Sequence, residues 1–458
     1  MQRLNKESPE STTVSELCEE YRRNNSISRR ELERFDVKRG LRNADGTGVM
    51  AGLTHVCNVH GYLIDDGDKV PDKGRLTYRG IDIEDIVSGC AAEGRFGFEE
   101  VAWLLIFGEL PDQRQYKRMC DLLFDNRELP EYFPEDMIIK APSKNIMNKL
   151  ARSVMALYSY DDDPENMSLE NNMRQSISLI ARMPSIMAYA YQVKRRHFDK
   201  ESMFFHPYEP GQCTAEAILN ALRPDRQFTR EEAELLDLFM VLHAEHGGGN
   251  NSTFTTRVLT SAGTDIYSAI GAAVGSLKGY RHGGANHRVK SMMTEIMENV
   301  KNWDDEDEVE AYLEKILRGE AHDGSGLIYG VGHAIYTLSD PRAVILKGKA
   351  RALAKEKGYL QRLSLYETVE RLAPKAFLKV TGSEKVLCAN VDFYSGLVYE
   401  MLGIPEDLFT PMFAVSRIAG WCAHRIEELT TGGRIMRPAY RALPVKQRYV
   451  PFSERRVR

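Results

Sequence analysis

The sequence predicts a mainly α-helical protein with one short β hairpin near its N-terminal end. Apolar residues recur at three- and four-residue spacing through most of the chain, for example in 98–110, 175–193 and 231–246, which is typical of helices with a buried face. Residues 56–80 instead alternate apolar with polar side chains and are rich in turn formers, which predicts a hairpin. Because long runs of alternating strands and helices are missing, a parallel doubly wound sheet is not expected.

The composition excludes several classes of function. The 458 residues carry a formal net charge of −5, so no general positive field favours nucleic acid or an anionic membrane. The seven cysteines form an odd set without a CxxC pair, which suits neither a disulfide framework nor a cysteine zinc site and indicates a reducing compartment. The opening residues do not resemble a secretory or mitochondrial leader, and no stretch approaches the roughly 18 apolar residues of a membrane span. A cytoplasmic location is therefore expected.

Taken in order, the segments predict three parts of the chain. Residues 1–40 are polar and charge-rich, and we expect one or two amphipathic surface helices there. After the hairpin, the helical pattern continues into 265–286, whose many Ala, Gly and Ser residues allow helix backbones to approach closely. Residues 288–385 are more charged. We therefore expect a polar N-terminal extension at 1–50, a large helical domain at 51–275 and 388–458, and a small inserted domain at 276–387.

The stretch LHAEHGGGN at 242–250 holds two histidines three residues apart. Thr229 and Glu232 form a capping-box pattern, which predicts a helix whose inward stripe ends with His243 and His246 before the glycines. Two imidazoles at this spacing could bind a metal, but a third ligand is not evident and the HExxH spacing of zinc proteases is absent. Core histidines bonded to backbone groups, or a substrate-binding histidine, are the alternatives.

Three further segments carry polar side chains in settings that suit catalysis. They hold His282 in the glycine loop KGYRHGGAN, His333 after Gly330 and Gly332 with Arg342 nine positions later, and Asp392 on the apolar run ANVDFYSG. Each alone is a weak signal, because a histidine near glycines is usually a loop residue and an aspartate before a helix is usually a cap. Together they provide two histidines and a carboxylate, the set that removal and return of a proton at carbon requires.

The ordered set His246, His282, His333, Arg342 and Asp392, with its surrounding segments, resembles the citrate synthase family. The resemblance extends from about residue 50 to about residue 450 and rests on six spaced segments in the family's order: LHAEHGGGNNSTFTTR, HGGAN, GVGHAIYTLSDPR, NVDFYSG, FAVSRIAGWCAH and RIMRP. It implies a nearly all-helical homodimer. Each subunit would have a large helical domain and a smaller domain that closes over the active site.

The resemblance also implies a reaction, in which acetyl-CoA condenses with oxaloacetate and the thioester is hydrolysed to give citrate and CoA. By resemblance, Asp392 is the base that removes the methyl proton, and His282 donates a hydrogen bond to the thioester oxygen. His333 would polarise the oxaloacetate ketone and protonate the new alcohol oxygen. No permanently bound cofactor and no metal are implied, and acetyl-CoA is a co-substrate.

The resemblance assigns the binding residues as well. Oxaloacetate is a dianion, and arginine suits a carboxylate because its planar fork binds in a two-pronged manner. Arg342, Arg417 and Arg437 match the family's carboxylate arginines, with Arg437 normally contributed by the partner subunit, and His246 completes the set. Three residues are assigned to CoA: Gly330 and Gly332 by close backbone approach, and Lys385 by contact with the phosphates.

Three other functions remain as alternatives at this stage. A 2-methylcitrate synthase would share the fold and mechanism but use propionyl-CoA, and one extra methylene changes binding by only about 1–3 kcal/mol, so the pocket lining decides. A metal-dependent hydrolase could be built on His243, Glu245 and His246. A helical binding protein without catalysis is the third, although it would have no need of the two histidines and the aspartate.

Overall fold

The computed structural model describes residues 9–25 and 27–455, which belong to two units, Met1–Gly52 and Leu53–Arg458. The first unit contains helices α1 (Pro9–Asn24) and α2 (Arg29–Arg34) and the short 3₁₀ helix η1 (Arg39–Leu41). Ser28 and Glu31 form a capping box at the start of α2. The expectation of one or two surface helices is therefore confirmed for the described residues.

The second unit begins with the predicted hairpin. Strands β1 (Cys57–Asp65) and β2 (Asp68–Tyr78) pair antiparallel, and the short β3 (Ile81–Asp82) pairs with the end of β2. The two residues between β1 and β2, Asp66 and Gly67, both have positive φ, at 46° and 89°. This is the backbone geometry that an Asp-Gly hairpin turn requires, so the sequence pattern at 56–80 is confirmed.

The hairpin supports the loop that follows the third candidate histidine. A Cβ atom on Gly74 would lie 1.9 Å from the Ser339 carbonyl oxygen, and one on Gly61 would lie 2.7 Å from the Ile335 carbonyl oxygen. The Thr337 hydroxyl also donates to the Gly61 carbonyl. Glycine at these two positions is therefore what allows the loop to rest directly on the strands.

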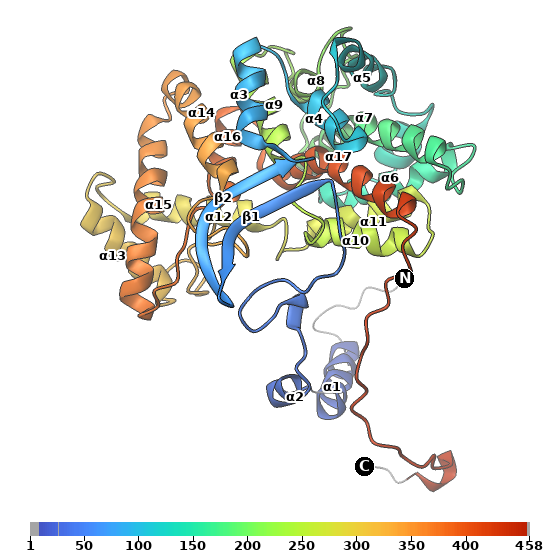
Figure 1. The fold of residues 1–458 in the computed structure, drawn as a ribbon, viewed down its shortest axis with the longest axis vertical. Helices are drawn as coiled ribbons and strands as arrows, with labels where there is room; N and C mark the ends of the chain where they lie inside the picture. Colours follow the sequence, from blue (N-terminus) through green and yellow to red (C-terminus); the bar gives the residue numbers. More distant parts are fainter. Residues whose placement is uncertain (1–8, 26, 456–458) are drawn as a thin grey trace. The chain divides into compact units, whose positions relative to one another are not determined.

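The rest of the second unit is helical, which confirms the predicted fold class (Figure 1). The α-helices are α3 (Ile83–Glu93), α4 (Phe98–Phe107), α5 (Gln113–Asp125), α6 (Ile146–Ala156), α7 (Leu169–Lys194), α8 (Thr214–Leu222), α9 (Arg230–His243), α10 (Asn251–Ser261), α11 (Ile266–Lys278), α12 (Ala285–Asn299), α13 (Glu306–Leu317), α14 (Pro341–Lys357), α15 (Leu360–Thr381), α16 (Val391–Met401) and α17 (Phe409–Thr430). Shorter helical turns are η2 (Pro134–Ile139), η3 (Leu157–Tyr160), η4 (Arg195–Asp199), η5 (Glu406–Leu408) and η6 (Phe452–Glu454).

Helix α17 is the centre of the second unit. Nearly every residue between Phe409 and Ile426 is buried, and the helix packs against α4, α7, α9, α10 and α11 (Figure 1). Helices α12 and α14 pack on α16, α13 packs on α15, and α14 also contacts α9. The candidate site residues therefore come from one buried helix, from the starts of α14 and α16, and from the segments after α9, after α11 and before α14. Among the described residues, no helix is both long and apolar enough to cross a membrane.

Candidate active site

The turn after α9 places the first two candidate histidines in different surroundings. His243 is fully buried, and its Nδ1 donates to the Phe239 carbonyl (2.9 Å) while its ring stacks on the Phe239 ring, so it is a core histidine, as expected. His246 is also buried, and the Nε2 atoms of both histidines have no hydrogen-bond partner among the described residues. The two rings differ in their neighbours: His243 packs against Phe239 and Phe413, whereas His246 lies edge-on to His333 and Tyr336. The Nε2 of His246, whose ring contacts another candidate residue, is therefore the one available to a ligand.

The expectation that one helix carries both histidines is wrong, because α9 ends at His243. The Arg417 Nε donates to the His243 carbonyl (2.6 Å), and the Gly420 N–H donates to the Ala244 carbonyl (3.2 Å). Tyr78 donates its hydroxyl to the carbonyls of this segment as well. These contacts satisfy the carbonyls at the helix end, so the chain forms a turn where the pattern predicted further helix.

Arg417 offers an unoccupied guanidinium fork. The residue is fully buried on α17, and neither of its Nη atoms has a hydrogen-bond partner in the described part of the chain. Burial lowers the pKa of Arg417 and the nearby Glu245 carboxylate opposes this, but a guanidinium remains charged in proteins. A charged, buried and unpaired fork is built to receive a carboxylate.

Arg342 lies at the start of α14 and is paired with Asp340. The Asp340 carboxylate accepts hydrogen bonds from the Arg342 backbone N–H (3.0 Å), Nε (3.0 Å) and Nη2 (2.7 Å). Burial lowers the pKa of Arg342, but the Asp340 charge outweighs it and raises the pKa. Asp340 also accepts from the Val391 N–H (3.1 Å), which joins the starts of α14 and α16. The sequence analysis missed Asp340, although an aspartate before Pro-Arg is a recognisable helix-capping signal.

The protonation of His333 is fixed by its own loop. Its Nδ1 accepts hydrogen bonds from the backbone N–H groups of Ile335 (3.1 Å) and Tyr336 (3.0 Å). Nδ1 is therefore the acceptor, and Nε2 carries the hydrogen of the neutral ring. The ring stacks on Tyr336 and lies edge-on to His246, with 5.2 Å between the two imidazole centroids. The structure thus brings His333 and His246 into contact, and these are two residues that the family resemblance assigns to oxaloacetate.

The glycine loop before His333 is joined to the segment before α16. Gly330 and Gly332 have φ angles of 78° and 99°, which side-chain-bearing residues rarely adopt. The Gly332 N–H donates to the Cys388 carbonyl (2.7 Å), and the Asn390 N–H donates to the Gly330 carbonyl (2.8 Å). A Cβ atom on Gly330 would lie 2.9 Å from the Phe393 ring. The glycines therefore have a packing role, and their contact with CoA stays a prediction.

Asp392 lies in the first turn of α16, where Asn390 is the capping residue. Burial raises the pKa of Asp392 to about 6, with the Asp340 charge adding to this and the charges of Arg342 and Arg417 opposing it. A carboxylate with a pKa close to neutrality suits a general base, because it is mostly ionised at pH 7 yet retains appreciable proton affinity.

His282 is held by two residues that the sequence analysis missed. Its Nε2 lies 3.1 Å from the Asn250 Oδ1 and 3.1 Å from the Ser252 hydroxyl. The Ser252 hydroxyl oxygen also accepts from the Trp421 Nε1 (3.2 Å), so its hydrogen is available to His282 or Asn250. Burial, followed by the Arg417 charge, lowers the pKa of His282 to about 4, so the ring is neutral at pH 7.

Two predicted binding residues are not brought to this group within one chain. Arg437 and Lys385 are both exposed, and no hydrogen bond or ion pair joins either side chain to another residue in the described ranges. In the same ranges, no three histidine, cysteine or acidic residues are grouped so that they could hold a metal ion.

Comparison with known proteins identifies the family. The model of the citrate synthase C-terminal domain matches residues 44–439, which is most of the chain. The chain belongs to the citrate synthase family. Citrate synthase of Haloferax volcanii is 34% identical over 92% of this chain and 99% of the relative, and citrate synthase 2 of Bacillus subtilis is 35% identical over 89% of this chain and 98% of the relative.

The relatives of this chain include an enzyme with a second activity and proteins of known structure. A 2-methylcitrate synthase of Corynebacterium glutamicum is 30% identical over 92% of this chain and 98% of its own length. Citrate synthase of Thermoplasma acidophilum, solved with carboxymethyl coenzyme A and oxaloacetate, superposes with a TM-score of 0.74 and 26% identity, covering 92% of this chain and 99% of that one. His282, His333 and Asp392 are thus found in a chain with the citrate synthase fold.

Gly420 is a position where this citrate synthase family member should not tolerate a side chain. A Cβ atom there would lie 2.0 Å from the Glu245 Oε2 and 2.5 Å from the Ala244 carbonyl oxygen. We expect Gly420→Ala to lower the free energy of unfolding by about 1–3 kcal/mol and to displace the His246 turn. Urea unfolding of Gly420→Ala and of Gly348→Ala, whose helical glycine faces open space, measures this effect. Equal stability of the two variants would contradict the prediction.

Proposed function

We propose that this protein condenses acetyl-CoA with oxaloacetate and hydrolyses the resulting thioester to give citrate and CoA. The observation that carries the proposal is the buried anion site formed by the Nε2 of His246 and the fork of Arg417, neither of which has a hydrogen-bond partner in the residues that the structure describes. It lies beside Asp392, a carboxylate with the pKa of a general base. Citrate synthases that share the fold, one of them solved with oxaloacetate and a CoA derivative, support the same reading.

Oxaloacetate binding requires positive charge at both of its carboxylates. Arg417 offers both Nη atoms to one carboxylate. Arg342 uses Nε and Nη2 for Asp340, which leaves its Nη1 for a substrate oxygen. His246 donates or accepts through Nε2 beside them. Arg437, supplied by the partner subunit of a homodimer, completes the set, which explains why a single chain leaves it exposed.

Carbon–carbon bond formation begins with removal of a proton from the methyl group of acetyl-CoA. Asp392 accepts this proton, and negative charge develops on the thioester oxygen. His282 stabilises that oxygen as a neutral donor from Nδ1, which requires the Ser252 hydroxyl to turn from the Asn250 Oδ1 and donate to Nε2. The Asn250 Oδ1 only accepts, so it is not a hydrogen-bond partner of Nε2 in this form. The low pKa of His282 favours this neutral form. The enol carbon then attacks the ketone carbon of oxaloacetate.

His333 acts on the other reactant. Because two backbone N–H groups occupy its Nδ1, the hydrogen on Nε2 is the one directed to substrate. It hydrogen-bonds to the ketone oxygen and is transferred to that oxygen as the new alcohol forms. Water then cleaves the citryl thioester, releasing citrate and CoA. No permanently bound cofactor takes part.

The remaining assignments concern CoA and the assembly. We propose that Gly330 and Gly332 present backbone groups to CoA and that Lys385 contacts its phosphates. We also propose that 276–387 forms the smaller domain of each subunit. The packing of α15 against α13 and α14 lies within this segment and supports the division, whereas α12 and α14 also pack on α16, which lies outside it. Closure of that domain would exclude water during condensation.

The test is steady-state release of CoA thiol from purified protein with oxaloacetate and either acetyl-CoA or propionyl-CoA. A higher kcat/KM with acetyl-CoA, lost in Asp392→Asn, is the expected result. A preference for propionyl-CoA would instead identify a 2-methylcitrate synthase. This activity is the second candidate because a 2-methylcitrate synthase of Corynebacterium glutamicum is among the relatives. Absence of thiol release with both would refute the proposal.

A further inference from the structure

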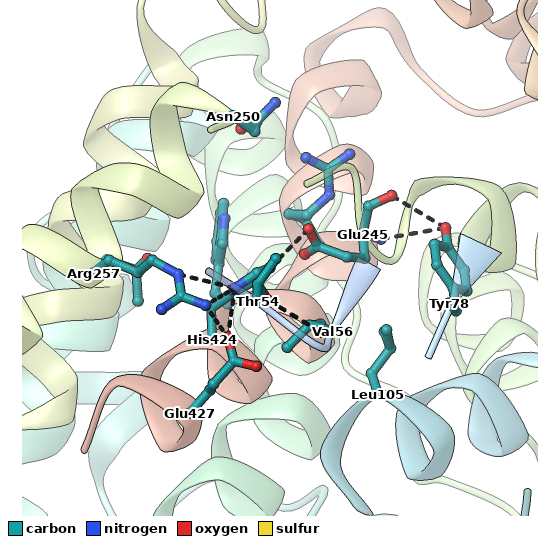
Figure 2. A network of polar contacts seen from close by, with 12 residues as sticks. Thr54, Val56, Tyr78, Leu105, Glu245, Asn250, Arg257, His424 and Glu427 are labelled. Atoms are coloured by element: carbon teal, nitrogen blue, oxygen red, sulfur yellow. Dashed lines mark hydrogen bonds and ion pairs between the residues drawn. The ribbon is translucent and has the colours of Figure 1, made fainter. Parts of the chain in front are cut away.

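Behind the substrate-binding turn, a fully buried histidine bridges a carboxylate and an arginine (Figure 2). His424 lies on α17, two helical turns after Arg417 and therefore on the same face. Its Nε2 is 2.9 Å from the Glu245 Oε1, and its Nδ1 is 3.1 Å and 2.7 Å from the Nε and Nη2 of Arg257. None of these three residues touches the reacting atoms in the mechanism above.

The direction of these hydrogen bonds is determined by Arg257. A guanidinium only donates, so the Nδ1 of His424 must accept, and the ring hydrogen is on Nε2. That hydrogen is donated to the Glu245 carboxylate. Arg257 is itself held by Glu427 and Glu428 on α17, and it cannot turn away from His424 without losing both carboxylates.

The outer end of this network is fixed to the start of β1. The Glu427 Oε1 accepts the His55 N–H (2.7 Å), so one glutamate joins α10, α17 and the segment that leads into the hairpin (Figure 2). His424 is thus placed by four segments of the chain. A side chain held in this way presents its Nε2 hydrogen in one direction.

Glu245 connects this network to the substrate site. It is fully buried, its N–H and carbonyl bond to the Tyr78 hydroxyl, and it directly precedes His246. Burial would raise the pKa of Glu245, but its contact with His424, followed by the charge of Arg417, lowers the pKa instead. The ionised carboxylate is therefore a fixed negative charge near Arg417.

We propose that His424 is a positioning residue for the dianionic substrate. Its hydrogen bond holds the Glu245 carboxylate in place. Glu245 in turn orients the turn that carries His246 and balances the Arg417 charge. This inference rests on the proposed function, because the ligand it serves is oxaloacetate. His424 acts only through Glu245. Its loss should therefore weaken oxaloacetate binding without removing any group that transfers a proton.

Two substitutions test the roles of the two ring nitrogens of His424 separately. In His424→Gln the side-chain amide can replace Nε2 and still donate to Glu245, whereas in His424→Asn it can replace only Nδ1. We expect His424→Asn to raise the Kd and KM for oxaloacetate about 10- to 100-fold with kcat within about threefold, and His424→Gln to stay within about threefold of wild type in all three constants. Calorimetry with oxaloacetate alone and steady-state kinetics measure these values.

The pH dependence gives a second readout that simple destabilisation would not move. The groups facing Glu245 are His424 and Arg417 on α17, Cys57 on β1 and Tyr78 on β2, and burial raises the pKa values of Cys57 and Tyr78 so that neither ionises near neutrality. In His424→Asn the contact that lowers the pKa of Glu245 is lost while burial remains. Oxaloacetate affinity should then depend on pH over a range in which the wild-type affinity is constant, because Glu245 gains a proton, and loses the charge that faces Arg417, at a higher pH.

The matched control is Arg425→Gln, which removes a buried arginine from the next position of α17. Arg425 bonds to Asn172, to the Thr260 hydroxyl on α10 and to the Thr264 carbonyl, none of which is a member of the network, so this variant should lose stability but keep the wild-type Kd for oxaloacetate. Glu245→Gln serves if His424→Asn does not fold, and it should weaken binding without this pH dependence, because position 245 no longer titrates. Equal Kd values for wild type and the folded variants, or equal losses in the Asn and Gln variants, would overturn the inference alone. A wild-type protein that does not bind oxaloacetate would overturn the proposed function with it.

Discussion

Replacing Asp392 with asparagine is expected to reduce kcat for citrate formation by about 10²–10⁴-fold, the usual contribution of a general base. Asparagine has nearly the same shape but cannot accept the methyl proton. Because Asp392 is not one of the groups proposed to bind oxaloacetate, calorimetry should show a nearly unchanged Kd for oxaloacetate. A variant that keeps wild-type kcat would remove Asp392 from the proposed role.

The pH profile of kcat tests the same residue in the unmodified protein. The base must be ionised, and burial raises the pKa of Asp392 to about 6. Activity should therefore be nearly constant at higher pH and fall as the pH is lowered through about 6. An unperturbed aspartate would place this fall near pH 4. The residual activity of Asp392→Asn should lack the acid limb, and a limb that persists in this variant would assign the titration to another group.

Replacing Arg417 with glutamine is expected to raise KM for oxaloacetate by about 10²–10³-fold, because two charge-assisted hydrogen bonds to one carboxylate are lost. The change also removes the Arg417 charge that helps to lower the pKa of the buried Glu245 carboxylate. Steady-state kinetics with varied oxaloacetate measure the effect. The KM for acetyl-CoA, measured at saturating oxaloacetate, should change much less.

Arg417→Lys separates charge from geometry at the same position. Lysine keeps the positive charge, but it cannot hold the His243 carbonyl and bind a carboxylate with a fork at the same time. We expect its KM for oxaloacetate to lie between those of wild type and Arg417→Gln. Wild-type KM in the glutamine variant would show that the partnerless fork does not bind substrate.

The local elements were predictable because short-range rules determine them. Thr229 and Glu232 cap α9 as their spacing indicated, and Asp66 and Gly67 form the two-residue turn of the hairpin. Periodic apolar residues likewise predicted the helices, because a helix must bury one face. The family could be recognised because the spaced histidine, arginine and aspartate segments keep their order.

Contacts between distant segments were not predictable in this way. The end of α9 at His243 depends on Arg417, and the fork of Arg342 is shared with Asp340 rather than being wholly free for substrate. Ser252 is placed against His282 by helix packing, not by spacing in the sequence. In each case the decisive partner could be identified only once the helices were packed.

The sequence by itself determined the mainly helical fold, the hairpin, the family and the residue types of the site. Only the tertiary structure decided which atoms of those residues are available. It occupies the Nδ1 of His333 with backbone N–H groups, leaves the Arg417 fork without a partner in 9–25 and 27–455, and buries Asp392 enough to raise its pKa to about 6. The physical reason is that hydrogen-bond direction and pKa depend on burial and on neighbouring charges, and folding brings those neighbours from distant parts of the chain.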